Sequence, residues 1–181
     1  MKIIVGLGNV GEIYAHTYHN LGFLAAECLA ARIGAAFSKR ECYALTAHTD
    51  YNGVRVILAK PETLMNRSGT AVQTLLKYYK CGLSDLIVLY DDIDIEKGAI
   101  RYREAGSAGT HNGMRDIVLK LGEDFMRVRI GAGRPPEGRD LASYVLSNIP
   151  KEERQLFVSA IEKAADKVLG LLGSAATPPP A

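Results

Sequence analysis

The sequence has no tryptophan and only three cysteines in 181 residues. Cys28, Cys42 and Cys81 are odd in number and lack the spacing of metal ligands, so neither a disulfide framework nor a zinc site is predicted. Scattered reduced thiols are typical of cytosolic proteins. We therefore expect a cytoplasmic location and no bound metal.

Long apolar runs are absent as well. No stretch of about 18 consecutive apolar residues occurs, so we expect no transmembrane helix and no membrane partner. The N-terminus enters an apolar, β-branched run without the regions of a signal peptide. With 48% hydrophobic and 23% charged residues, we expect one compact domain over residues 1–173. Residues 174–181 contain three consecutive prolines and are expected to form a disordered tail.

The net charge is only +2, but the charges are unevenly distributed. Residues 97–139 contain nine basic side chains against five acidic ones, and this surplus of four exceeds that of the whole chain. Such a sector indicates a polyanionic partner met by one face. The count alone leaves open that these arginines only keep the protein in solution. Arg101 with Arg103, and Arg127 with Arg129, lie two apart on expected strands, so each pair points to one side of a sheet, which favours a patch.

Short apolar segments alternate with helical patterns along the chain. Strands are expected at residues 2–8, 43–49, 54–59, 86–90, 99–103 and 128–131. Helices are expected at residues 21–33, 68–79, 114–121 and 151–172. Interleaved strands and helices, with one hairpin at Asn52-Gly53, predict an α/β fold. We expect a single-domain α/β/α sandwich with a mixed, mostly parallel central sheet.

Three glycines near the N-terminus, Gly6, Gly8 and Gly11, match the spacing of the dinucleotide-binding fingerprint. That fingerprint requires a helix beginning in the glycine turn and an acidic residue ending a second strand about 20 residues later. Here the residues after the turn have no apolar stripe, and the next acid, Glu27, falls inside a helical pattern. Nucleotide binding is therefore the weaker alternative.

Polar side chains gather where expected strands end and helices begin. They include Asn9, His19, Asn20, Asn66, Asp91, His111 and Asn112. Open α/β sheets build their sites at such strand ends. An imidazole that meets a carboxylate is a suitable general base, and amide groups can bind a carbonyl oxygen.

No serine lies in a Gly-x-Ser-x-Gly turn and no cysteine has a supporting motif, so direct attack by water is favoured over a covalent intermediate. Each of these polar residues could instead cap a helix or serve a turn. The residues alone therefore indicate an α/β protein, with hydrolysis as a hypothesis.

Six segments, in this order, resemble bacterial peptidyl-tRNA hydrolase over roughly residues 1–150. They are Val5-Gly-Leu-Gly-Asn-Val-Gly11, Tyr14-x-x-Thr-Tyr-His-Asn20, Lys60-Pro-x-Thr-x-Met-Asn-x-Ser-Gly69, Asp91-Asp-Ile-Asp94, Gly109-Thr-His-Asn-Gly113 and Arg129-Ile-Gly-x-Gly-Arg-Pro135. The resemblance implies a monomeric enzyme, without metal or cofactor, that cleaves the ester joining a peptide to the 3′ ribose of tRNA.

The resemblance also implies a role for each matching residue. His19 matches the catalytic base, and Asp91 matches the carboxylate that orients it. The positions that match substrate-binding residues are Asn9, Tyr14, Met65, Asn66, His111 and Asn112. Arg103 and Arg129 match a basic clamp on tRNA phosphate, which agrees with the basic sector. We expect His19 to stay neutral, because the N-terminus of the following helix disfavours an added cation.

Five positions depart from the family pattern. They are Val10 for proline, Tyr18 for arginine, Leu64 for phenylalanine, Tyr90 for histidine and Thr110 for glycine. None removes a catalytic side chain. The main alternative is a non-catalytic RNA-binding relative on the same fold, but such a scaffold has no need for His19, Asp91 and the three asparagines together.

Overall fold

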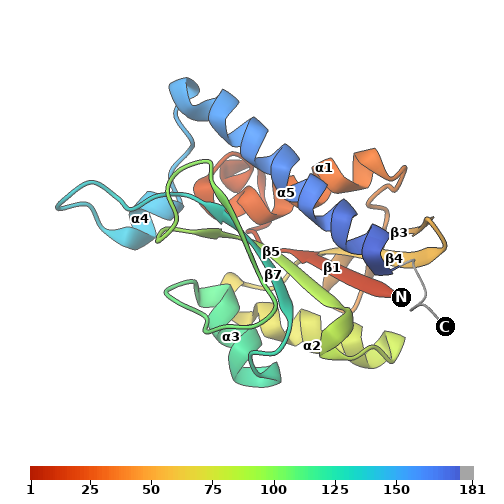
Figure 1. Ribbon diagram of the computed structural model, residues 1–181. Helices are drawn as coiled ribbons and strands as arrows, with labels where there is room; N and C mark the ends of the chain where they lie inside the picture. Colours follow the sequence, from red (N-terminus) through yellow and green to blue (C-terminus); the bar gives the residue numbers. More distant parts are fainter. Residues whose placement is uncertain (176–181) are drawn as a thin grey trace.

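The computed structural model describes residues 1–175 and contains one seven-stranded sheet in the order β2-β3-β4-β1-β5-β7-β6 (Figure 1). The strands are β1 (Lys2–Gly6), β2 (Lys39–Glu41), β3 (Ala44–Tyr51), β4 (Val54–Pro61), β5 (Leu86–Asp92), β6 (Ile100–Arg103) and β7 (Met126–Gly131). The central strands β4, β1, β5 and β7 are parallel, whereas β2, β3 and β6 pair antiparallel at the edges. The expected mixed, mostly parallel sheet is confirmed.

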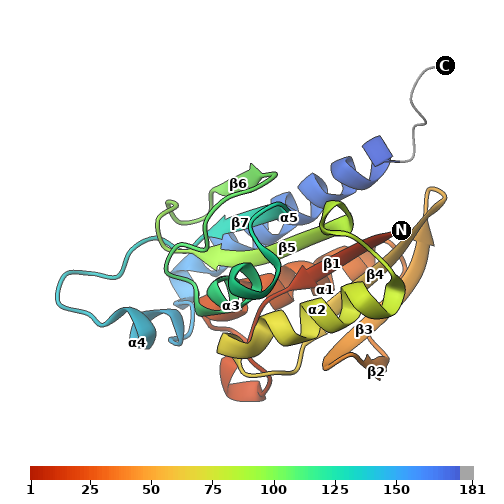
Figure 2. The ribbon, with the colours of Figure 1, turned by 90° about the horizontal axis from the view of Figure 1, so that it is seen from below.

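Helices cover both faces of the sheet, which confirms the expected sandwich (Figures 1 and 2). The long helices are α1 (Leu21–Arg32), α2 (Ser68–Tyr79), α3 (Asn112–Leu121) and α5 (Arg154–Ala175), and α4 (Leu141–Val145) is short. One buried cluster joins the sheet to α1 and α5, and the other joins it to α2 and α3. In β1, Ile4 belongs to the first cluster and Ile3 and Val5 to the second, and all three are fully buried. This strand is apolar on both sides because both of its faces are covered.

Several expected elements match closely, and the differences have local causes. α2 has the expected bounds, and Asn52 and Gly53 both have positive φ, as a tight hairpin turn requires. α3 begins two residues before its expected start because the His111 side chain accepts a hydrogen bond from the Met114 amide and caps it. β1 ends at Gly6, before the expected Gly8. β2 and α4 were not expected.

The C-terminal helix begins and ends three residues later than expected. A 3₁₀ turn, η5 (Lys151–Glu153), precedes α5, which continues to Ala175 and so includes the first two residues of the expected tail. The rest of that tail, residues 176–181, lies outside the described residues. Within residues 1–175, no helix has both the length and the apolar character needed to cross a bilayer.

The N-terminal glycines allow α1 to pack directly on the sheet. A Cβ on Gly6 would lie 2.2 Å from the carbonyl oxygen of Gly22, and one on Gly22 would lie 2.3 Å from that of Leu89. α1 begins at Leu21, well after the glycine turn, so no α-helix begins there to face a pyrophosphate. The turn therefore lacks the geometry of the dinucleotide fingerprint. Its glycines instead bring the start of α1 against the carboxyl ends of β1 and β5.

Candidate active site

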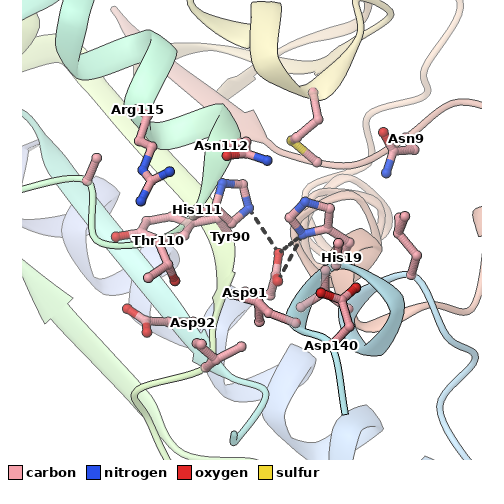
Figure 3. Close-up of a pocket in the computed structure, with 17 residues that line it drawn as sticks. Asn9, His19, Tyr90, Asp91, Asp92, Thr110, His111, Asn112, Arg115 and Asp140 are labelled. Atoms are coloured by element: carbon pink, nitrogen blue, oxygen red, sulfur yellow. Dashed lines mark hydrogen bonds and ion pairs between the residues drawn. The ribbon is translucent and has the colours of Figure 1, made fainter. Parts of the chain in front are cut away.

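A cavity of about 440 Å³ opens at the carboxyl end of the parallel strands (Figure 3). Six of the residues expected in the site line it: Asn9, His19, Met65, Asp91, His111 and Asn112. They come from the end of β1, the start of α1, the turn before α2, the end of β5 and the start of α3. The structure thus brings together segments that are far apart in the sequence.

Asp91 lies between two histidines at the floor of this cavity (Figure 3). Nδ1 of His19 lies 3.0 Å from each Asp91 oxygen, and Nε2 of His111 lies 3.0 Å from Oδ1. The Asp91 carboxylate is 2% exposed, so these contacts replace the water that it would otherwise bind. Because Asp91 takes up Nδ1, the other nitrogen of His19, Nε2, is left to act as a base or a donor. It has no hydrogen-bond partner among residues 1–175.

The charge of Asp91 decides the protonation of His19. Burial acts to lower the pKa of His19, but the charge and hydrogen bond of Asp91 outweigh it, so the pKa lies above its ordinary value. Burial acts to raise the pKa of Asp91, whereas His19 and His111 together bring it well below its usual range. The helix end acts to lower the pKa of His19, whereas Asp91 raises it, so the reason given for a neutral His19 does not hold and its neutral state stays a prediction. A full charge in direct contact outweighs the partial charge of a helix terminus.

The donor pattern fits a hydrogen-bonded triad better than a metal centre. One nitrogen or oxygen from each of His19, Asp91 and His111 lies within 4.8 Å of the others, which is a spacing that could hold an ion. However, Nδ1 of His111 accepts a hydrogen bond from the Met114 amide at 3.2 Å, so its Nε2 carries the proton and donates to Asp91. A nitrogen that carries a proton has no lone pair for a metal. The metal-free site stays a prediction.

The turn that carries His19 is anchored in the core by the residue before it. It lies in the 3₁₀ turn η2 (Tyr18–Asn20), which leads into α1. The preceding residue, Tyr18, is buried, and its ring stacks on Tyr144 at 4.7 Å while its hydroxyl donates to Glu153. At this departure from the family pattern, the residue before His19 is thus an aromatic anchor in the core.

Asn20 holds Asn9 at the mouth of the cavity. Its Oδ1 accepts the Asn9 amide at 2.8 Å, and its Nδ2 donates to the Asn9 carbonyl at 3.0 Å. Both side-chain groups of Asn20 are thus used on the backbone of a single residue, which leaves the Asn9 side chain free for a ligand. Although Val10 stands beside it without the constraint of a proline ring, Asn9 is fixed from the other side. Sequence reasoning noted Asn20 but gave it no role.

Met65 and Asn112 form the wall on the α2–α3 side. A Cβ on Gly113 would lie 2.7 Å from the Met65 sulfur, so the glycine makes room for Met65 over the site. Asn66 is exposed beside Met65, and Tyr14 is half-buried in the turn η1 (Glu12–Tyr14). Neither Tyr14 nor Asn66 lines the cavity, and their expected substrate contacts stay predictions.

The four arginines of β6 and β7 share one face of the sheet. The register places Arg101 opposite Arg129 and Arg103 opposite Arg127, and each pair points to one side of the sheet, as its spacing predicted. They differ in burial, because Arg127 is 1% exposed and donates to the carbonyls of Ser107 and Glu123. Arg103 is exposed, and Arg129 is paired with Asp92 at 3.2 Å. Arg103 and Arg129 lie outside the lining of the cavity, where a clamp on the body of a tRNA would lie.

One wall of the cavity was missed from the sequence. Leu141, Ala142 and Val145 of α4 line it, together with Asp140, which caps that helix by accepting the Ser143 amide. The signal was present, since an aspartate precedes apolar residues four apart, but a five-residue helix gives too little periodicity to detect. Arg115, Thr110 and Tyr90 also line the cavity, and Tyr90 packs edge-on against His111.

The chain is similar to known proteins over nearly its whole length. The family model described as peptidyl-tRNA hydrolase matches residues 3–177. The curated peptidyl-tRNA hydrolase of Alkaliphilus metalliredigens is 47% identical, over 91% of this chain and 89% of the relative. That of Chloroflexus aggregans is 48% identical, over 93% and 90%. The crystal structure of peptidyl-tRNA hydrolase from Acinetobacter baumannii has a TM-score of 0.89 at 36% identity, over 97% of this chain and 92% of that one.

Proposed function

We propose that this chain, which belongs to the peptidyl-tRNA hydrolase family, hydrolyses the ester of peptidyl-tRNA with His19 as the general base. One observation supports this role above the others. Asp91 binds Nδ1 of His19 through both oxygens, and Nε2 is left open at a cavity. This arrangement fixes the tautomer that a base for water requires.

In the proposed reaction, Nε2 of His19 takes a proton from a water molecule as its oxygen attacks the acyl carbonyl. The imidazolium that forms is stabilised by the adjacent Asp91 carboxylate. Collapse of the tetrahedral intermediate breaks the bond to the ribose oxygen, which takes the proton from His19 and leaves as the free hydroxyl of tRNA. General base catalysis of this kind contributes roughly 10²–10⁴-fold. No step requires a metal or a cofactor.

The amide side chains around the cavity supply the remaining contacts. Asn9 and Asn112 line the cavity on two sides (Figure 3), where they could contact the ester, and we assign the exposed Asn66, next to Met65 in the sequence, to the substrate as well. Amide groups can donate to an oxyanion or accept from a peptide amide without adding a charge that would change the pKa of His19. We assign Tyr14 and Met65 to the peptide and His111 to the support of Asp91.

Two cations outside the cavity are proposed to bind the tRNA body as a phosphate clamp: the exposed Arg103 and the half-buried Arg129. Every proposed catalytic residue comes from a single chain, so a monomer suffices. Cys28, Cys42 and Cys81 are free thiols, which agrees with a reducing cytoplasm.

The test of His19 measures the release of free tRNA from a purified peptidyl-tRNA. His19→Ala is expected to reduce turnover by roughly 10²-fold or more while binding of uncharged tRNA is retained. His16→Ala is a matched control, because His16 is exposed on the same segment. Turnover that survives in His19→Ala would remove the residue from the mechanism. A wild-type protein that binds tRNA and releases none would instead be a non-catalytic RNA-binding relative.

The clamp is tested by the salt dependence of tRNA binding. Arg103→Gln and Arg129→Gln should each weaken binding and lower the slope of log K against log salt by about 1, because each phosphate contact releases about one counterion. Arg55→Gln, at the other end of the sheet, should leave the slope unchanged. A slope unchanged by either clamp variant would take that arginine out of the contact.

A further inference from the structure

Arg115 is a cation inside the cavity that the reaction above does not use. It lies in the first turn of α3, exposed, and lines the same cavity as His19. Figure 3 shows its guanidinium beyond His111, on the side of the cavity away from Asn9. Its Nε donates to the Gly109 carbonyl at 3.2 Å, which anchors the planar group. Within residues 1–175, neither terminal nitrogen has a hydrogen-bond or ion-pair partner.

No neighbouring carboxylate forms an ion pair with Arg115 among residues 1–175. Asp92 lines the same cavity, but its carboxylate is paired with Arg129 at 3.2 Å. Asp140 uses a carboxylate oxygen to cap α4. Arg127, in contrast, has its guanidinium on two carbonyls and over the Phe125 ring. Arg115 is therefore a cation of the cavity with two nitrogens free to bind an anion.

The substrate has an anion at a matching place. The ribose that carries the scissile ester also carries, on its 5′ oxygen, the phosphodiester that joins the last two nucleotides. That phosphate is the fixed charge nearest to the ester, so it enters the cavity whenever the ester reaches His19. A planar guanidinium suits it, because two parallel N–H groups can bind two phosphate oxygens.

We propose that Arg115 binds the phosphodiester between the last two nucleotides and is a specificity-determining residue for the 3′ end of the substrate. The assignment rests on the proposed function, because it places the ester at His19. The cations of this face then have different roles, according to their distance from the ester. Arg115 recognises the terminal nucleotide, whereas Arg103 and Arg129 lie outside the cavity and contact phosphates further along the tRNA.

Three substrates with the same N-acetylaminoacyl ester separate these roles. The first carries the ester on adenosine and has no phosphate, the second carries it on the dinucleotide cytidylyl-adenosine with one phosphodiester, and the third is the complete tRNA. Each is tested with the wild type, Arg115→Gln, Arg115→Lys and Arg103→Gln, and Arg55→Gln is the control for loss of one exposed arginine.

The wild type should have a higher kcat/KM for the dinucleotide ester than for the adenosine ester. Arg115→Gln should lose this gain, roughly tenfold, through KM, and should cleave the adenosine ester like the wild type. Arg115→Lys should keep part of the gain, because the charge remains without the paired donors. Arg103→Gln should affect only the complete tRNA.

Two results would overturn the proposal. In one, Arg115→Gln slows the adenosine and dinucleotide esters by the same factor, so that the residue acts through the loop at Gly109 and not through a phosphate. In the other, the phosphodiester gives the wild type no advantage, or Arg115→Gln retains the advantage in full. The wild type and His19→Ala on complete peptidyl-tRNA report on the proposed function separately, since a wild type that releases no tRNA contradicts that function whatever Arg115 does.

Discussion

Two regions of the molecule place a histidine against a carboxylate. At the carboxyl end of the sheet, His19 lies 3.0 Å from both oxygens of Asp91. At the far edge of the sheet, Nε2 of His48 lies only 2.6 Å from Oε1 of Glu41. The second contact is shorter, yet the two clusters differ in what surrounds the pair. Comparing them shows which property of a histidine–carboxylate pair indicates catalysis.

In the edge cluster, hydrogen-bond and ion-pair partners surround the Glu41 carboxylate. Glu41 also accepts from Thr46 at 2.9 Å and from the Tyr79 hydroxyl at 2.6 Å, and it is paired with Lys39. These partners tie β2 to β3 and to the end of α2. At the site, by contrast, Asp91 serves only two imidazoles, and one of them keeps a nitrogen open to a cavity. An open second nitrogen facing space for a substrate, and not a short contact, distinguishes a base from a structural bond.

The largest expected effect is on kcat, and it distinguishes the carboxylate of Asp91 from that of Glu41. Asp91→Asn should lower kcat roughly 10²–10⁴-fold, because the amide can neither stabilise the imidazolium nor hold the tautomer with Nε2 unprotonated. Glu41→Gln should change kcat for tRNA release by less than about twofold, because it lies away from the cavity. Equal losses of kcat in the two variants would mean that lost folding, and not a lost partner of the base, explains the result for Asp91→Asn. Both variants are therefore measured at matched folded fractions.

The second effect is a change in the pH profile of kcat/KM. The pKa of His19 lies above its usual value of 6.5 because Asp91 outweighs burial. Since the neutral imidazole is the base, activity should rise with pH through a midpoint above 6.5 in the wild type. In Asp91→Asn, burial remains without the charge, so the midpoint should move to lower pH while the maximum falls. A midpoint that stays in place would mean that Asp91 does not set this pKa. Glu41→Gln should leave the profile unchanged.

The sequence was sufficient to predict the long helices and strands, but not which charges lie next to the site residues. The bounds of α2 and the buried strand β5 follow from local periodicity, which needs no knowledge of the fold. The proximity of His19 and Asp91 came only from the family resemblance, because nothing local relates two residues 72 apart in sequence. The raised pKa of His19 was not predicted, for the same reason. Its nearest sequence neighbour is a helix end, but its nearest charge comes from β5.

The two-residue spacing of the arginines predicted that each pair points to one side of the sheet, but not whether each side chain is exposed or buried there. Arg127 and Arg129 do point to one side, as their spacing predicted. Whether a residue on that side meets solvent depends on which loop covers it, and the loop at Ser107 covers Arg127. That Arg115 lines the cavity was not predicted, because a helical arginine near a glycine loop has no sequence signal. Only the fold shows that its terminal nitrogens face a cavity.

The third effect is on stability in acid. The pKa of Glu41 is lowered from 4.5 to about 2, where burial alone would raise it and the bonds from Lys39, Tyr79, Thr46 and His48 lower it. A depressed carboxylate pKa stabilises the folded state above the unfolded value of 4.5, and this contribution is lost as the pH falls towards 2. Glu41→Gln should therefore lower the free energy of unfolding by about 2 kcal/mol at neutral pH, with a smaller difference below pH 4.5. Urea unfolding at several pH values measures it, with the exposed Glu152→Gln as control. A difference independent of pH would show that lost packing, and not charge, is the cause.

The smallest effect belongs to the histidine of the edge cluster. His48→Ala removes one bond to Glu41 and an edge-on contact with the Tyr79 ring at 5.9 Å, while Lys39, Thr46 and Tyr79 still hold the carboxylate. The free energy of unfolding should fall by about 1 kcal/mol, as for the loss of one hydrogen bond whose acceptor keeps other partners. Release of free tRNA should be unchanged, because His48 does not line the cavity at His19. The pair His19→Ala and His48→Ala is therefore the sharpest form of the comparison, since both substitutions remove an imidazole from a carboxylate. A tenfold loss of kcat in His48→Ala would show that an open nitrogen is not what makes one of the two histidines a base.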